Sequence, residues 1–348
     1  MKSLLIVIIF VSILNGQYFS QFSEALDGSL GDANLASTSP TLLNPASFFG
    51  TNQTIARTSF YYLSTKHEQL DNSFEIYDDI KYYGFTSVLK YRNYGFFYKY
   101  YANEVAETIN ILHGNFREGM GNYYSIHYTI GIIFSYNLTK KITLGIAPTL
   151  YIFDNPHENS HNKTMDFTVG INYTPFSALR FGIVINNILK SDIEYYSTNI
   201  FISQNLSELQ RSIDMGFSIY PVERISLFSS LKNIFKESIK HYTSEYDYRS
   251  ENTNLSYHVG ISFRIIESLF LDAGYKLVTG TLTPVDLKRY QFKNLGFSYK
   301  LSDLFITVMY GWNNIGSENS SEFRSNNLFH IINESSNGQF KFSASYLF

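Results

Sequence analysis

The sequence predicts an all-β protein: a transmembrane antiparallel up-and-down β-barrel of about 14 strands with an N-terminal plug segment. Three observations support this fold class. Large apolar and small polar residues alternate over runs of about 10 residues, the length that crosses a membrane as a tilted strand. Short and long connections between these runs alternate along the chain. Aromatic residues make up 17% of the chain, with 29 Tyr and 30 Phe, which is typical of barrel girdles.

The first residues predict a signal peptide over residues 1–16. Lys2 supplies the positive start, residues 4–14 form an apolar core, and Gly16 is a small residue suited to cleavage. This core is shorter than the roughly 18 apolar residues of a transmembrane helix, and no later stretch reaches that length. We therefore expect embedding by strands, in the outer membrane of a bacterial cell, with outer-membrane lipid as the surrounding partner. The absence of cysteine excludes a disulfide framework and a lipid-anchored cysteine.

Residues 17–53 break the alternating pattern. They are small, polar and turn-rich, and they carry no helical apolar stripe. Because they precede the first strand, they start on the side of the short turns and can fold back into the lumen. We predict an N-terminal periplasmic or plug segment here, followed by the barrel over residues 54–348.

The alternation defines two faces on each predicted strand. In residues 124–137, Tyr, Ile and Phe alternate with Ser, His, Thr and Gly, and residues 165–174 and 255–264 repeat the pattern. The polar face is mostly Gly, Ser, Thr and Asn, which suits a lumen better than the Lys- and Glu-rich surface of a soluble sandwich. The short connections are expected at 92–94, 138–141, 175–178, 221–224, 266–268 and 301–303, and the long ones near 64–80, 111–121, 153–163, 188–208, 237–253, 281–289 and 314–337.

Several polar and charged residues are predicted to face the lumen, where a charged side chain is tolerated if it is hydrated or paired with an opposite charge. Hairpin register around Pro221 sets Asp214 opposite Lys232, and we expect a structural ion pair there rather than a substrate contact. Glycines on the same face bring strands close to whatever fills the barrel, or let the strands bend. The lumen candidates are His127, Asp166, Arg180, Asp214, Lys232, His258 and Arg264, and the glycines are Gly131, Gly145, Gly170, Gly182, Gly216, Gly260 and Gly274.

The chain ends on the alternating run Gly338–Phe348, with Tyr346 and Phe348 on its apolar face. This ending resembles the C-terminal signal that the barrel-assembly machinery recognises, which implies that machinery as a partner. We expect the last strand to end in the periplasm and to pair back with the strand that begins near Thr54.

Composition and motifs argue against an enzyme, a metal site and a nucleic-acid partner. A net charge of −3 without a basic tract excludes a nucleic-acid partner. No Ser-His-Asp spacing supports a hydrolase, so neither an enzyme nor a cofactor is expected. His157-Glu158-Asn159-Ser160-His161 fits the H-E-x-x-H zinc pattern, which requires a helix. It lies in a turn-rich link between two predicted strands, so we expect no catalytic or metal site.

The stretch DGSLGDANLASTSPTLLNPASFF resembles the N-terminal plug segment of the FadL superfamily, in which a run of small residues precedes Asn-Pro-Ala. Asn44, Pro45 and Ala46 match that triplet. Within the superfamily, the chain length and the plug sequence are more similar to the PorV/PorQ branch, although the usual Gly-Gly-Ala is here Gly31-Asp32-Ala33.

The resemblance implies two functions. The PorV/PorQ likeness implies a non-enzymatic component of type IX-like protein secretion or surface attachment, which binds secretion-system proteins through its loops. The FadL likeness implies a passive transporter of a hydrophobic ligand such as a long-chain fatty acid. A diffusion porin fits less well, because a plug would occlude its channel. An apolar pocket that joins the loop side to residues 44–49 would favour transport, and a lumen packed solid would favour partner binding.

Overall fold

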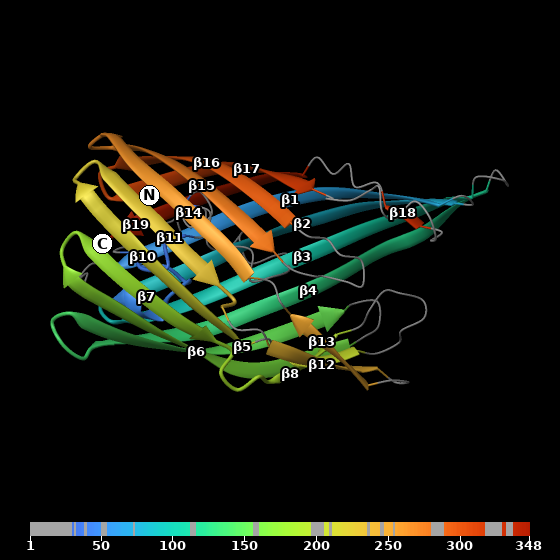
Figure 1. The fold of residues 1–348 in the computed structure, drawn as a ribbon, viewed down its shortest axis with the longest axis horizontal. Coiled ribbons are helices and arrows are strands. Elements are labelled where there is room, and N and C mark those ends of the chain that lie inside the picture. The colour runs from blue at the N-terminus through green and yellow to red at the C-terminus, as the bar shows by residue number, and fades with distance from the viewer. Residues whose placement is uncertain are drawn as a thin grey trace.

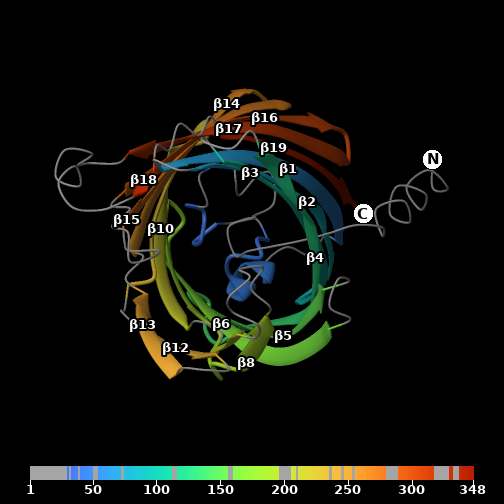
Figure 2. The ribbon, with the colours of Figure 1, turned by 90° about the vertical axis from the view of Figure 1, so that its right-hand side faces the viewer.

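The structure is a computed structural model, and it describes residues 30, 33–37, 40–49, 54–71, 74–111, 116–155, 160–195, 205–208, 211–234, 237–243, 247–252, 255–279, 289–316, 329–331 and 337–348. The predicted signal peptide, residues 1–16, lies outside this set. Fourteen antiparallel strands close into a barrel (Figures 1 and 2). They are β1 (Ile55–Asp71), β2 (Phe74–Tyr91), β3 (Tyr94–Ile111), β4 (Phe116–Asn137), β5 (Ile142–Asn155), β6 (Ser160–Phe176), β7 (Leu179–Asn186), β10 (Ser212–Val222), β11 (Ile225–Lys232), β14 (Leu255–Ile266), β15 (Leu269–Thr279), β16 (Arg289–Leu301), β17 (Leu304–Gly316) and β19 (Asn337–Leu347).

The barrel closes between its first and last strands. β1 pairs with β2 on one side and with β19 on the other, in a register that sets Ile55 opposite Leu347. The backbone N–H of Phe348 donates to the carbonyl oxygen of Thr54 at 2.9 Å. The predicted fold class and the predicted pairing of the chain end with the strand near Thr54 are therefore confirmed.

The outer face of the barrel is apolar and the inner face is polar. Ile132, Phe297 and Val259 point outward with 47%, 51% and 49% of their surface exposed, whereas Asp272 and Ser298, on the inner face, are fully buried. A water-soluble protein sorts its side chains the other way, because exposed apolar surface costs free energy in water. This arrangement suits a barrel with a lipid-facing exterior.

Strand lengths differ around the barrel. β7 and β11 have 8 residues each, whereas β1 to β4 have 17 to 22 and extend beyond the rest of the barrel at the end opposite the C-terminus (Figure 1). The long loops predicted near 64–80 and 111–121 are therefore wrong, since most of those residues continue these strands. Beyond the lipid both faces of a strand meet water, so the apolar–polar alternation that marks a spanning strand is absent there.

Short strands occupy several of the other predicted loops. A second, four-stranded sheet lies at the long-loop end of the barrel, and one further strand pairs with the outer end of β1. These elements were not predicted, because strands of three to seven residues are too short to show a recognisable period. They are β8 (Asp192–Tyr195), β9 (Asn205–Glu208), β12 (Glu237–Thr243) and β13 (Asp247–Asn252) in the sheet, and β18 (Phe329–Ile331) beside β1.

The one helical element among the described residues is η1, a 3-10 helix over Pro45–Phe48. Pro45 suits its first turn, because the fixed φ of proline matches a helix start and its missing N–H would have no partner there. In the described part of the chain, no helix is long and apolar enough to cross a membrane.

Candidate functional site: the lumen and the N-terminal segment

The described part of the N-terminal segment lies inside the barrel, where Figure 2 shows it as the blue ribbon within the ring of strands. Its helix η1 contacts β4, β5 and β6. Asn44 caps η1: its side-chain oxygen accepts a hydrogen bond from the backbone N–H of Ala46 at 3.0 Å. Residues 45–48 are all buried.

The Asn44–Ala46 triplet is bonded both to its own segment and to the barrel wall. The side-chain amide of Asn44, which is fully buried, donates to the carbonyl oxygen of Leu35 at 3.1 Å and to the side-chain oxygen of Asn172 at 2.8 Å. The hydroxyl of Ser135 donates to the carbonyl oxygen of Pro45 at 2.6 Å. The triplet that carries the family resemblance thus fixes the segment against β4 and β6.

Glycines on the inner wall make room for this segment. A Cβ built on Gly145 would lie 2.6 Å from the carbonyl oxygen of Pro45, and one on Gly170 would lie 2.9 Å from Cδ of Pro45 and closer still to the side-chain oxygen of Asn44. Both distances are shorter than real Cβ contacts. Gly145 and Gly170 are directly opposite each other in the β5–β6 register. Further wall glycines face the same segment: Gly182 and Gly216 lie against Leu35, and Gly260 lies against Leu30.

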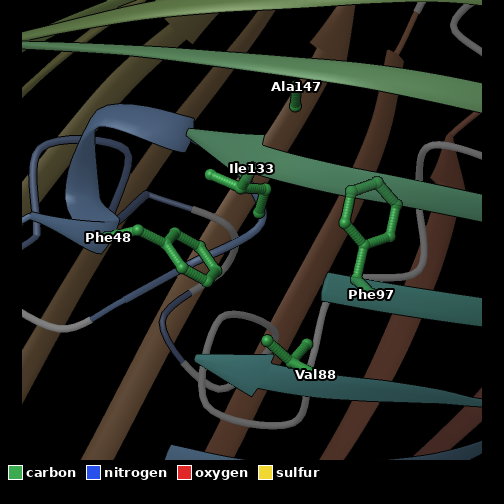
Figure 3. Close-up of a cluster of buried hydrophobic side chains, with 5 residues drawn as sticks. All are labelled: Phe48, Val88, Phe97, Ile133 and Ala147. Atoms are coloured by element: carbon green, nitrogen blue, oxygen red, sulfur yellow. The ribbon is translucent and has the colours of Figure 1, made fainter. Parts of the chain in front are cut away.

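An apolar cluster joins the segment to the wall (Figure 3). Phe48 of η1 is fully buried against Val88 of β2, Phe97 of β3, Ile133 of β4 and Ala147 of β5. Leu42 packs at its edge. These inward-facing residues give the β2–β5 side of the lumen an apolar lining next to the N-terminal segment.

Tyrosines extend the aromatic lining on this side. The hydroxyl of Tyr61 donates to the carbonyl oxygen of Tyr100 at 3.1 Å, across Gly84, and its ring centroid lies 5.5 Å from that of Tyr101. The hydroxyl of Tyr151 donates to the side-chain oxygen of Asn187 at 3.1 Å. Because the hydroxyls of Tyr61 and Tyr151 are bonded, their rings present mainly carbon to the lumen.

The inner wall from β15 through β19 to the first residues of β1 is hydroxyl-rich. Ser298 donates to a carboxylate oxygen of Asp272 at 3.1 Å, and its hydroxyl lies 3.0 Å from that of Thr307. Ser59 donates to Ser343 at 2.9 Å across the β1–β19 closure. The lumen therefore has an aromatic, apolar side and a polar side.

Two of the predicted lumen residues act as anchors for loops. The carboxylate of Asp166, which is fully buried, accepts hydrogen bonds from the backbone N–H groups of Phe167, Leu189 and Ser191 at 2.6, 2.9 and 3.1 Å. It thereby holds the segment after β7 against β6.

Asp214 does the same on β10. It accepts from the side-chain amide of Asn186 at 3.1 Å and from the backbone N–H of Asn233 at 3.0 Å. The register sets Asp214 beside Lys232, with which it interacts electrostatically. Asn187 and Asn233, which begin these two excursions, both have a left-handed φ, of 51° and 56°.

The remaining lumen candidates lie apart from one another. His127 and His258 are buried on β4 and β14, and Nε2 of His258 lies 2.8 Å from the hydroxyl of Ser256. Arg264 pairs with Glu223 at 3.3 Å at the short-turn rim, and Arg180 faces inward on β7. The candidates therefore line different parts of the wall and form no single site.

The predicted lumen candidates did not include three buried cations, Arg57, Lys90 and Lys341. The alternation of their strands could have placed each on the inner face. Nε of Arg57 donates to the hydroxyl of Ser345 at 2.9 Å, and its Nη1 donates to the carbonyl oxygen of Pro40 at 3.2 Å. Arg57 thus also fastens the N-terminal segment.

The H-E-x-x-H pattern is not on a helix at its second histidine. His161 lies in β6, paired with Asp154 of β5, while residues 156–159 lie outside the described part of the chain. Among the described residues, no cluster of three His, Cys, Asp or Glu side chains could hold a metal ion.

Comparison with known proteins supports the barrel geometry. No family model matches the sequence, and no curated protein matches it. A Pseudomonas aeruginosa FadL homologue superposes with a TM-score of 0.61 at 12% identity, covering 96% of this chain and 98% of its own. The toluene transporter TodX of P. putida superposes with a TM-score of 0.62 at 14% identity, covering 93% and 97%. The monoaromatic hydrocarbon channel CymD gives 0.58 at 13% identity, covering 95% and 98%.

The chain thus has the fold of a transmembrane outer-membrane β-barrel. More particularly, it has the 14-strand fold that the FadL homologue and TodX share.

Proposed function

We propose that this chain is an outer-membrane channel that passively transports hydrophobic small molecules. The observation that carries the proposal is the apolar cluster of Phe48, Val88, Phe97, Ile133 and Ala147, which lies inside the barrel where the N-terminal segment meets the wall. An apolar lining inside a barrel favours hydrophobic compounds over sugars or ions, because burying apolar surface is favourable and burying unpaired polar groups is costly. Structures with the same fold include a toluene transporter and a monoaromatic hydrocarbon channel.

The tyrosine lining supports the same function. Tyr61, Tyr101 and Tyr151 lie on the wall that also holds the apolar cluster, farther toward the long-loop end of β1, β3 and β5. Together they form an aromatic surface along which a hydrophobic molecule can move toward the N-terminal segment. Displacement of that segment would then complete the route to the periplasm.

Uptake into proteoliposomes tests this function. We expect the wild-type barrel to admit a labelled fatty acid or toluene faster than empty vesicles do, and to exclude sucrose. Phe97→Ser should slow uptake because Phe97 faces the lumen with 6% of its surface exposed. Phe96→Ser is the matched control, since Phe96 is its chain neighbour and faces outward with 47% exposed. Uptake no faster than that of empty vesicles would reject transport.

A second candidate function is that of a secretion or surface-attachment component of the PorV/PorQ type. It is favoured by the amount of folded backbone outside the barrel proper: the outer parts of β1 to β4 and the four-stranded sheet of β8, β9, β12 and β13. Such surfaces can bind partner proteins, and transport alone does not require them. Deletion of residues 192–208, which carry β8 and β9, should abolish secretion and spare uptake if this function is correct. Secretion at the wild-type level in that variant would reject it.

A further inference from the structure

The inner wall near the short-turn rim carries one nitrogen of a basic side chain and two hydroxyls that have no hydrogen-bond partner among the described residues. Arg180 of β7 and Ser218 of β10 are directly opposite each other in the register. Tyr220 lies two residues farther toward the rim, where its backbone N–H bonds to Ala178. Phe181 and Phe217, the chain neighbours of Arg180 and Ser218, point outward with 42% and 39% exposed, so Arg180, Ser218 and Tyr220 share the inner face.

These three side chains have buried polar atoms without a hydrogen bond. In the described part of the chain, Nε of Arg180, the hydroxyl of Ser218 and the hydroxyl of Tyr220 are buried and have no partner, and Ser218 as a whole is fully buried. Buried polar atoms in folded proteins are nearly always bonded. On the same wall, Asp166 and Asp214 are fully engaged by N–H donors.

The described part of the N-terminal segment contacts the wall beside these side chains at two places. Leu35 lies over Gly182 and Gly216, a directly opposite pair one inward position from Arg180 and Ser218. On the neighbouring strand, Phe228 lies opposite Ser218 and packs against Leu30 and Ala33 of the segment. The ring of Tyr220 meets that of Phe228 edge to face at 6.2 Å. Apolar groups of the segment and of β11 therefore border the part of the inner face on which the three polar side chains lie.

The donor set defines the ligand class. A guanidinium and two hydroxyls supply several hydrogen-bond donors and one positive charge, which suits an oxyanion. Among the described residues, the carboxylates on this part of the wall are already engaged, since Glu223 pairs with Arg264 and Asp214 with its amide donors. We propose that Arg180, Ser218 and Tyr220 form a binding site for a small oxyanion, either a carboxylate or inorganic phosphate. This site is distinct from the apolar cluster and does not depend on which compound the barrel transports.

Calorimetric titration of the purified full-length barrel at pH 7 tests the site. Octanoate is the carboxylate probe, and octanol is its uncharged match. We expect the wild type to bind octanoate at least tenfold more tightly than octanol, and Arg180→Gln to remove that difference, since hydrogen bonds to charged groups are among the stronger ones. Ser218→Ala should weaken octanoate binding by a smaller factor. Arg264→Gln is the matched control, because Arg264 lies at the rim in its pair with Glu223, and it should bind as the wild type does.

Competition distinguishes the sources of the anion. If inorganic phosphate displaces octanoate, the site takes free oxyanions; if it does not, the site takes the headgroup of a carboxylic acid, and either result supports the proposal. Equal affinities for octanoate and octanol in the wild type would overturn it, as would unchanged octanoate binding in Arg180→Gln. Heat-modified migration on gels reports whether each variant is folded, and Arg180→Lys replaces any glutamine variant that fails to fold.

Discussion

Replacing Gly170 by alanine should loosen the N-terminal segment from the barrel wall. The added Cβ would meet the side-chain oxygen of Asn44 and lie 2.9 Å from Cδ of Pro45. Neither group can move easily, because Asn44 is bonded to Leu35 and Asn172 and the ring of Pro45 is rigid. The substitution therefore forces either the wall or the segment to shift.

The size of the effect follows from overpacking and lost hydrogen bonds. An extra methyl group in a tightly packed site costs about 1–3 kcal/mol. Displacement of the amide of Asn44 removes its bonds to the wall, at about 1 kcal/mol each. A change of about 1.4 kcal/mol shifts an equilibrium tenfold. We therefore expect the displaced state of the segment to become at least tenfold more populated.

Ion conductance across planar bilayers measures this population, because a segment inside the lumen restricts the passage of ions. Gly170→Ala should show openings at least tenfold more frequent than those of the wild type. Gly311→Ala is the control: its Cβ would also collide with a side chain, that of Asn294, but this contact lies between β16 and β17 and does not involve the segment.

Equal conductance in the wild type and Gly170→Ala, with both folded, would refute the reasoning. It would mean that contact with this glycine does not hold the segment in place. Equal increases in Gly170→Ala and Gly311→Ala would refute it as well, since general strain in the wall would then explain the result.

Three further predictions follow from buried contacts. Asp166→Ala should leave the backbone N–H groups of Leu189 and Ser191 without acceptors, so proteolysis after β7 should accelerate at least tenfold while the barrel stays intact. Phe48→Ala should lower the free energy of unfolding in urea by about 3–5 kcal/mol, as for other buried Phe deletions, and no change would exclude a packed cluster. Phe348→Ser should slow assembly into membranes, measured by the heat-modified gel form, with little effect on the stability of barrels already folded.

The sequence predicted the barrel well because one physical constraint acts on every spanning strand. Lipid on one side and the lumen on the other impose a strict period of two, and this period remains visible even in the last strand, with Phe340 and Tyr346 on one face and Lys341 and Ser345 on the other. The same constraint does not act beyond the membrane. For this reason the outer ends of β1 to β4 and the four-stranded sheet were taken for loops.

The lumen was harder to predict, because its side chains contact the N-terminal segment, whereas the outer side chains all face one uniform medium, the lipid. Alternation predicted Asp166 and Arg180 on the inner face, but it could not distinguish a loop anchor from a side chain whose polar atom has no partner among the described residues. The segment itself has no period, so its contacts with the wall were not predictable from its own residues.

Glycine was the one inner-face residue type whose role was visible in the sequence. A strand weakened by glycine needs a compensating reason, and close approach of another segment was one of the two that the sequence left open. The structure shows that approach at Gly145, Gly170 and Gly260, each of which lies against the backbone or a bonded side chain of the segment. The wall is therefore shaped to its occupant over several strands, which implies that the segment docks in one defined position and that small changes in the wall can release it.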